Sequence, residues 1–320
     1  MASTYSSVPA GTKTLKLNTG NEIPVLGFGT WQSPAGQVEK AVEAALKAGY
    51  RHIDCAWMYG NEQEVAVGIR NSGVPRKDIF ITTKIWGTYH RRVEEGLDDS
   101  LKKLGLDYVD LLLIHWPVPL VVRGEEKIPV DENGKRMLDQ ERKLSETWAD
   151  MEKVYESGKA KAIGISNASQ ALLEELLPKV KVVPAANQIE LHPYLPQHDL
   201  VRFCQAKGIV CEAYSPLGST GSPLLQEDAV QAIAKSKGCD PAQVVISWGA
   251  QRGVAVLPKS VTPSRIESNA TFVALDEDDM RKLNEIYQGS GKQKRFGMPA
   301  WGADFRFDDW KVPGAYTIKV

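Results

Sequence analysis

The fold of this chain is decided by residues 79–116, which read IFITTKIWGTYHRRVEEGLDDSLKKLGLDYVDLLLIHW. The β-branched run over 79–85 predicts a strand, and so does the apolar run over 109–116. Between them, apolar residues recur every three to four positions over 90–104, which predicts a helix that ends at Gly105. A strand, a helix and a second strand in this order predict two parallel strands joined by a right-handed connection.

The same unit recurs along the rest of the sequence. Further strands are predicted over 25–30, 52–56, 160–166, 185–191, 209–214 and 254–258, and further helices over 37–48, 62–72, 144–157, 170–177, 198–206, 242–251 and 263–269. Units of this kind, eight in all, predict an α/β fold of the (β/α)8 TIM-barrel type. An N-terminal β-hairpin within 14–30, extra helices over 228–237 and 277–287, and an irregular C-terminal tail lie outside the barrel. An open, doubly wound sheet has the same local pattern and is the alternative architecture.

Composition excludes several classes of protein. Of the 320 residues, 42% are hydrophobic and 25% are charged, as is ordinary for a soluble enzyme, and no linker or low-complexity tract divides the chain. We therefore expect residues 1–320 to form one domain. A formal net charge of −1 gives no general attraction to nucleic acid or to a membrane surface, so we expect neither as a partner.

The N-terminus and the cysteines bear on the compartment. Residues 1–11 lack the apolar core of a secretory signal, and the longest apolar runs are too short to span a membrane. No Cys-x-x-Cys pair occurs among the four cysteines, which are Cys55, Cys204, Cys211 and Cys239. We interpret them as reduced thiols and expect a cytoplasmic, metal-free monomer that acts on a small molecule.

Side chains suited to proton transfer fall at the ends of successive predicted strands. Asp54 ends the second strand, and Tyr59 follows in the next loop. Lys84 lies near the end of the third strand and His115 at the end of the fourth. Each has an ordinary structural role when taken singly, but in a barrel the strand ends meet at one face.

Together these groups predict a proton donor for a carbonyl that receives hydride. We expect the ammonium of Lys84 to lower the pKa of the Tyr59 phenol from its usual value near ~10. The carboxylate of Asp54 would balance the ammonium, and the imidazole of His115 would orient the substrate oxygen.

The segments around these residues resemble the aldo-keto reductase family. The similarity lies, in the family's order and from about Leu15 to Tyr287, in GFGTW (27–31), RHIDCA (51–56), YGNE (59–62), TKIW (83–86), IHWP (114–117), GISN (164–167), NQIE (187–190), YSPLG (214–218) and LPKS (257–260). The resemblance implies a barrel that reduces aldehydes or ketones with NADP(H). It also implies that the catalytic tetrad is Asp54, Tyr59, Lys84 and His115, with Tyr59 as the general acid.

The resemblance further implies which residues bind NADP(H). Those expected around the nicotinamide are Thr30, Trp31, Asp54, Ser166, Asn167, Gln188 and Tyr214, with Ser166, Asn167 and Gln188 on the carboxamide and Tyr214 stacked on the ring. Those expected along the pyrophosphate are Ser215, Pro216 and Leu217. Those expected around the adenosine and its 2′-phosphate are Lys259, Ser260, Val261, Thr262, Arg265 and Asn269. The basic residues of this last group precede or begin a predicted helix, and such a place suits a phosphate without reference to the family.

Two departures from the family pattern bear on the cofactor. Ser268 stands where many members carry Glu, which leaves the preference for NADP over NAD open. The loop over 218–223 is short beside the belt that covers the cofactor in aldose reductase-like members. We expect the cofactor to exchange faster here than in long-belt members.

The substrate pocket is expected to have an aromatic wall. Its predicted residues are Trp31, Trp57, Tyr59, Trp86, His115 and Trp116, with the loop 117–142 and the tail after Gly289 completing it. The basic and aromatic tail over 292–301 is similar to that of fungal members acting on glyceraldehyde, glycerol, dihydroxyacetone or pentoses. We therefore expect a small polyol or sugar carbonyl as the substrate.

Other functions and other motifs are also compatible with parts of the sequence. The same barrel also serves as a cofactor-binding regulatory subunit or a lens-type structural protein, and the full tetrad favours the enzyme. The run 27–32 lacks the last glycine of a dinucleotide fingerprint, and the Tyr-x-x-x-Lys pattern over 155–159 contains Gly158, which is expected to end a helix. His192 and His198 have no accompanying metal-ligand motif, and His192 is expected in a loop at the barrel mouth.

Overall fold

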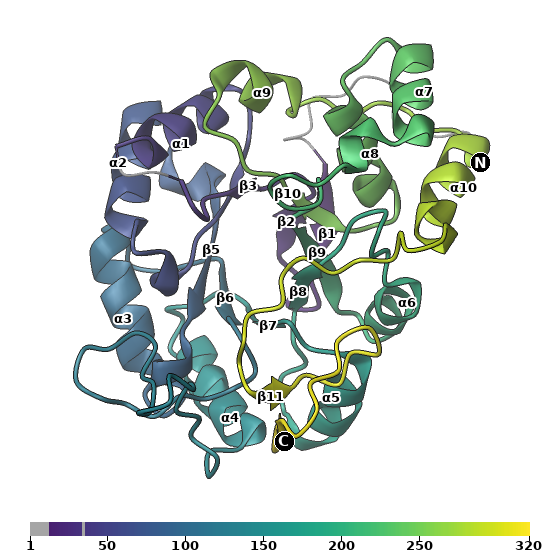
Figure 1. The fold of residues 1–320 in the computed structure, drawn as a ribbon. Helices are drawn as coiled ribbons and strands as arrows, with labels where there is room; N and C mark the ends of the chain where they lie inside the picture. Colours follow the sequence, from purple (N-terminus) through teal and green to yellow (C-terminus); the bar gives the residue numbers. More distant parts are fainter. Residues whose placement is uncertain (1–12, 34–35) are drawn as a thin grey trace.

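The structure is a computed structural model that describes residues 13–33 and 36–320. The segment 1–12, on which the expectation about a secretory signal depends, lies outside the described residues. Parallel strands form an eight-stranded sheet in chain order (Figure 1). Their bounds are β3 (Phe28–Gly29), β4 (His52–Asp54), β5 (Phe80–Ile85), β6 (Leu111–Ile114), β7 (Ile163–Ser166), β8 (Ala186–Glu190), β9 (Val210–Tyr214) and β10 (Ala255–Leu257).

The first and last strands of this sheet meet and close the barrel. Val256 N donates to Val25 O at 2.7 Å, and Gly27 N donates to Val256 O at 2.9 Å. A Cβ atom on Gly27 would lie 2.4 Å from Leu257 Cδ2 and 2.7 Å from His52 Nδ1, so this close approach requires glycine. The predicted (β/α)8 barrel is therefore confirmed, and the open-sheet alternative is wrong.

Helices surround the barrel as the apolar spacing predicts. They are α1 (Val38–Lys47), α2 (Glu62–Ser72), α3 (Val93–Leu104), α4 (Leu144–Glu156), α5 (Gln170–Leu176), α6 (His198–Ala206), α8 (Pro241–Gln251) and α9 (Pro263–Ser268). The hairpin of β1 (Thr14–Lys16) and β2 (Glu22–Pro24) and the helices α7 (Asp228–Lys237) and α10 (Glu277–Glu285) are the additions. No helix among the described residues is long and apolar enough to cross a bilayer.

The helix predicted over 90–104 begins later, at Val93. His90 is buried instead of opening the helix, because its ring is held from both sides. Its Nε2 lies 3.1 Å from Trp116 O, and its Nδ1 lies 3.2 Å from Thr147 Oγ1. The ring thereby ties the segment before α3 to the end of β6 and to α4.

The tail after α10 is more ordered than the sequence predicts. In Figure 1 it runs from α10 past β9 to β11 (Ala303–Asp304), which pairs in parallel with β12 (Tyr316–Thr317). Arg306 Nη1 donates to Glu175 Oε2 on α5 at 2.7 Å. Arg295 is buried, with its guanidinium 4.3 Å from the centroid of the Phe307 ring, and bonds both carboxylate oxygens of Asp309. Such contacts hold a segment with little regular structure against the barrel.

Candidate active site

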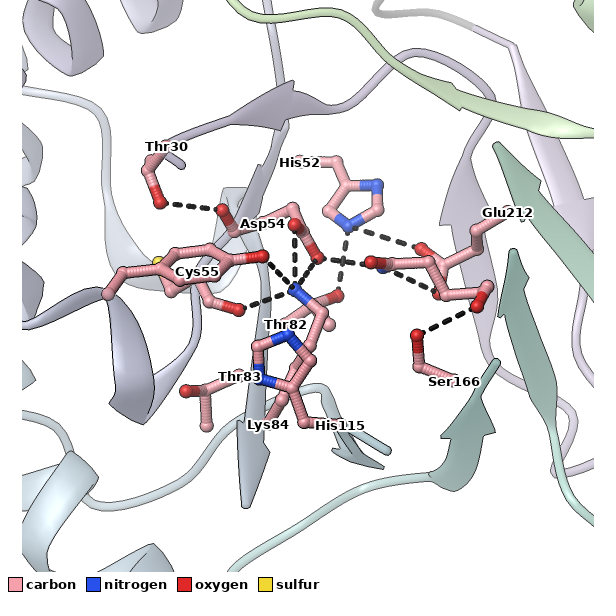
Figure 2. A network of polar contacts seen from close by, with 12 residues as sticks. Thr30, His52, Asp54, Cys55, Thr82, Thr83, Lys84, His115, Ser166 and Glu212 are labelled. Carbon is pink, nitrogen blue, oxygen red and sulfur yellow. Dashed lines mark hydrogen bonds and ion pairs between the residues drawn. The ribbon is translucent and has the colours of Figure 1, made fainter. Parts of the chain in front are cut away.

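Lys84, on β5, is the centre of a polar cluster inside the barrel (Figure 2). Its Nζ donates to both carboxylate oxygens of Asp54 at 2.8 Å and to Cys55 O at 2.7 Å. The same Nζ lies 3.4 Å from Tyr59 Oη. The Tyr59 ring in turn meets the His115 ring edge to face, with centroids 5.6 Å apart. The structure thus brings together the four groups that the strand ends predict.

A short turn after β4 presents Tyr59 to this cluster. Trp57–Tyr59 form a single 3₁₀ turn, and Gly60 follows in the left-handed region at φ 70°. Asn61 Nδ2 then donates to Thr30 O at 2.9 Å, which ties the turn to the end of β3. The left-handed residue lets the chain reverse directly into α2, so the phenol stays over the barrel.

The electrostatics of Tyr59 differ from the expectation. Burial raises the pKa of Tyr59 to about 12, and the Lys84 ammonium opposes that rise without overcoming it. The prediction that the ammonium brings this pKa below its usual value is therefore wrong, because withdrawal from water outweighs the nearby charge. Tyr59 is fully protonated at neutral pH and holds a proton to give.

Lys84 is charged at neutral pH, whereas His115 is neutral. Although burial lowers the pKa of Lys84, the nearby Asp54 carboxylate and Tyr59 hydroxyl outweigh it, and the net direction is upward. Burial, and then the Lys84 charge, hold the pKa of His115 well below its usual range. The site therefore contains a permanent ammonium beside a neutral imidazole, and a neutral imidazole has one N–H to donate.

The residues expected around the nicotinamide lie in one network with Asp54. Gln188 Nε2 donates to Asp54 Oδ1 at 2.9 Å, and Ser166 Oγ donates to Gln188 O at 2.7 Å. Asn167 Nδ2 donates to His115 O at 2.9 Å, and Asn167 Oδ1 accepts from Tyr214 Oη at 2.8 Å. Asn167 sits at φ 62°, a left-handed conformation that Asn tolerates better than most residues. Thr30 Oγ1 donates to Asp54 O at 2.8 Å, so the end of β3 joins the same network.

The residues expected around the adenosine phosphate fit an anion. Lys259 and Arg265 are exposed, and neither forms an ion pair with a carboxylate within 13–33 or 36–320. Ser260 Oγ accepts from Thr262 N at 3.1 Å where α9 begins. Two cations without counter-charges beside a helix start are a fitting place for a phosphate. Asn269 is buried at the other end of α9.

Around the pyrophosphate residues the chain turns sharply. Ser215 has φ 49°, which turns the chain straight after β9. Gly218 N donates to Ser215 O and Ser222 N to Ser219 O, each at 2.9 Å. Pro216 and Leu217 lie inside the first of these turns. The loop over 218–223 thus folds on itself as a compact turn.

The predicted aromatic wall is continuous with the tail. Trp86 lies with its ring centroid 5.3 Å from that of His115, and Trp301 of the tail lies 5.4 Å from Trp86 and 5.5 Å from Trp116. Trp31 is 48% exposed, with its ring centroid 4.8 Å from that of Tyr59. These residues bracket the phenol and the imidazole.

Trp57 is held slightly apart from that set. Its Nε1 donates to Asp99 Oδ2 at 2.5 Å, and its ring packs edge to face on Tyr89 with centroids 5.0 Å apart. It therefore borders the turn that carries Tyr59 from the side of α3.

Sequence reasoning missed a buried carboxylate that holds the tail. Glu190, at the end of β8, is wholly buried and accepts from Phe296 N at 2.7 Å and from Gly297 N at 2.6 Å. His192 Nε2 lies 2.9 Å from Glu190 Oε1. His192 is in a loop, as expected, but it is buried as the partner of this carboxylate. A stretch of more than a hundred residues separates Glu190 from Phe296, so no local pattern relates them.

Other features of the surface lie away from this site. A groove of about 790 Å³ lies between the starts of α5 and α6 and the tail, and none of the tetrad lines it. Within the described residues, no group of three or more His, Cys, Asp or Glu side chains is placed to hold a metal ion. The cysteines form no disulfide, and Cys55, Cys204 and Cys211 are buried.

Comparisons with known proteins agree with this geometry. The family model "Aldo/keto reductase family" matches residues 25–288. The chain is 52% identical over 301 residues to the D-galacturonate reductase of Hypocrea jecorina, covering 92% of this chain and 97% of that protein. It is 49% identical over 298 residues to the glycerol 2-dehydrogenase (NADP(+)) of Saccharomyces cerevisiae, covering 91% and 95%. The solved structure of the aldose reductase from Schistosoma japonicum superposes with a TM-score of 0.83 at 40% identity, covering 89% of this chain and 94% of that one.

Proposed function

This chain belongs to the aldo-keto reductase family, and from that premise we propose how its residues work and on what they act. The family resemblance is confirmed, and the chain is an NADP(H)-dependent oxidoreductase. We propose that it reduces an aldehyde or ketone to an alcohol, reversibly, with Asp54, Tyr59, Lys84 and His115 as the catalytic groups.

The proposed reaction divides the work among these side chains. NADPH, held by the residues proposed above, would supply a hydride for the carbonyl carbon. Tyr59 gives its phenolic proton to the carbonyl oxygen, which becomes strongly basic as the carbon is reduced. Lys84 stabilises the phenolate that remains, and Asp54 holds Lys84 in place.

His115 completes the arrangement as a neutral hydrogen-bond donor to the same oxygen. Because burial keeps the pKa of His115 well below its usual range, the imidazole orients the substrate without competing as an acid. The observation that carries the proposal is the Lys84 Nζ, bonded to Asp54 and 3.4 Å from Tyr59 Oη.

Several observations support the proposed cofactor contacts. The unpaired cations Lys259 and Arg265 suit the 2′-phosphate, and the Ser166–Asn167–Gln188 network suits the carboxamide. Ser268 Oγ bonds the carboxylate of Asp240, so an acidic group stands beside the position where many members carry Glu. We propose that NADP is strongly preferred over NAD because of the two cations.

The relatives' names support a small, polar sugar carbonyl as the substrate. They include a D-galacturonate reductase, a glycerol 2-dehydrogenase and a D/L-glyceraldehyde reductase. Trp31 and Trp86 contact the phenol and the imidazole, and Trp301 packs on Trp86. We further propose that residues 1–320 act as one domain and as a monomer in the cytoplasm, where the free thiols stay reduced.

The proposal is tested by mixing the protein with NADPH and DL-glyceraldehyde and following the absorbance of NADPH. We expect turnover in the wild type and at least a hundredfold lower kcat in Tyr59→Phe, with NADPH binding within threefold of wild type. Near-normal turnover in Tyr59→Phe would show that another group is the acid. An absence of turnover with every member of a panel of aldehydes, ketones, pentoses and uronates would favour the cofactor-binding regulatory subunit.

A further inference from the structure

Arg136 carries a charge that no group in the structure neutralises. Its guanidinium carbon lies 4.1 Å from the centroid of the Trp301 ring. Its Nη1 is buried without a hydrogen-bond partner, and no carboxylate among the described parts of the chain forms an ion pair with it. Burial lowers the pKa of Arg136, as expected for a cation withdrawn from water without a counter-charge. Buried guanidinium N–H groups normally have a hydrogen-bond acceptor. The described part of the protein supplies none for Nη1 of Arg136.

This unpaired cation stands on the wall of the proposed active site. Arg136 packs on Trp301, Trp301 contacts Trp86, and Trp86 contacts His115. Trp86 Nε1 also donates to Lys127 O at 2.5 Å, which fixes the loop 117–142 against the wall. Three successive contacts therefore link Arg136 to the imidazole that we propose orients the carbonyl.

A second cation of the same loop lies beside the turn that carries Tyr59. Lys127 Nζ lies 5.2 Å from the centroid of the Trp57 ring and 3.2 Å from where a Cβ on Gly60 would stand. Gly60 directly follows Tyr59. Lys127 is exposed, and none of its described neighbours forms an ion pair with it.

Two other cations of this loop have carboxylate partners. Arg123, in the same loop, bonds Glu126 through Nε at 2.8 Å and Nη2 at 2.7 Å. Arg142, at the end of the loop, pairs with Asp150. Arg123 and Arg142 thus have counter-charges, whereas Arg136, which packs on Trp301, has none among the described residues.

We propose that Arg136, supported by Lys127 of the same loop, forms a subsite for a carboxylate at the far end of a sugar aldehyde whose carbonyl lies against Tyr59 and His115. The inference rests on the proposed function and narrows its substrate class to open-chain sugar acids. A planar guanidinium offers two parallel N–H donors that match a carboxylate, and the aromatic surroundings strengthen such a bond by excluding water. Salt weakens the contribution of the exposed Lys127 more than that of Arg136.

The test compares D-glucuronate with D-glucuronamide, which has the same carbon skeleton but no charge. In the wild type we expect kcat/KM for the acid to exceed that for the amide by about tenfold. Arg136→Met keeps an unbranched apolar stem against Trp301 and removes the charge. We expect this variant to bring the ratio close to one, chiefly by raising KM for the acid, with Arg136→Lys between the two.

Arg123→Met is the matched control, because it removes a paired cation from the same loop. We expect it to leave the ratio of acid to amide unchanged. A wild-type ratio near one, an unchanged ratio in Arg136→Met, or an equal loss in Arg123→Met would each overturn the subsite. A preference for D-glucose 6-phosphate over D-glucose that exceeds the preference for acid over amide would overturn the choice of a carboxylate.

Two further readouts separate this proposal from the proposed function. Turnover of DL-glyceraldehyde without a preference for the acid defeats the subsite and leaves the reductase in place. If no carbonyl is turned over, calorimetric titration of the NADPH-loaded protein with D-gluconate decides the subsite by itself. Binding that is lost in Arg136→Met and kept in Arg123→Met would support it, and binding equal in all three proteins would overturn it.

Discussion

The tetrad and the wall opposite it are built in contrasting ways. Asp54, Lys84 and His115 come from the ends of neighbouring strands β4, β5 and β6, and hydrogen bonds through Lys84 join the first two to Tyr59. The wall combines tryptophans that follow strands with a long loop and the tail, and ring contacts such as that of Trp301 with Trp86 join its parts. From this contrast we expect that the barrel determines the chemistry, whereas the loop and the tail determine which carbonyl reaches it.

The largest expected effect is on the tetrad side. Lys84→Met should lower kcat for DL-glyceraldehyde by about a thousandfold, because the phenolate of Tyr59 then forms without a neighbouring charge. Single-turnover measurements with saturating NADPH would separate this step from cofactor binding. Lys47→Met removes an exposed lysine paired with Glu43 and serves as the control. If Lys84→Met raised KM and left kcat unchanged, Lys84 would act in substrate binding, as the aromatic wall does, and not in the chemical step.

The next effect tests whether the wall depends on the buried carboxylate of Glu190. Glu190→Gln places an amide N–H₂ against one of the two backbone N–H groups, so we expect about 3 kcal/mol lower stability. The tail should become more sensitive to trypsin at Lys292, Lys294 and Arg295, and KM should rise more than kcat falls. Urea unfolding and timed proteolysis would measure this, with the exposed Glu174→Gln as control. Loss of kcat alone would contradict a positioning role.

A pH-dependent effect on stability concerns the buried carboxylate of Glu212. Glu212 is wholly buried, with one carboxylate oxygen 3.8 Å from His52 Nε2, and burial and then Asp54 raise its pKa from the usual 4.5 to about 8. The unfolded chain loses this proton above pH 4.5 while the folded chain keeps it, so the group lowers the free energy of unfolding as pH rises from 4.5 to 8. Above pH 8 that cost is constant.

Glu212→Gln removes this titration. We expect the variant to gain about 4 kcal/mol relative to wild type at pH 8 and little at pH 4.5. Urea unfolding at the two pH values would show the difference. An equal change at both would mean that packing, rather than ionisation, distinguishes the two side chains.

The smallest expected effect is on the pH dependence of kcat. Tyr59 has a pKa of about 12 and stays protonated, and the pKa of His115 is too low for it to gain a proton. The rate of reduction should therefore change less than threefold between pH 6 and pH 9. A fall with an apparent pKa between 7 and 8.5 would show that bound cofactor and substrate lower the pKa of Tyr59, as the sequence analysis expected.

The local pattern of the chain was sufficient for the barrel and for the meeting of the tetrad. The periods of strands and helices can be seen in residues that are close together in the sequence. The carboxyl ends of the strands of a parallel barrel always share one face. That rule alone places Asp54, Lys84 and His115 together. Sequence reasoning failed where the outcome depends on atoms from distant elements.

The sequence by itself thus determined the fold and the family, and it predicted which four groups meet inside the barrel. Only the tertiary structure decided the balance at Tyr59, where burial raises the pKa more than Lys84 lowers it. It also decided that Glu190 binds Phe296 and that Arg136 rests on Trp301 without a counter-charge. The reason is physical: desolvation and long-range hydrogen bonds depend on every group packed around an atom, and those groups are far apart along the chain.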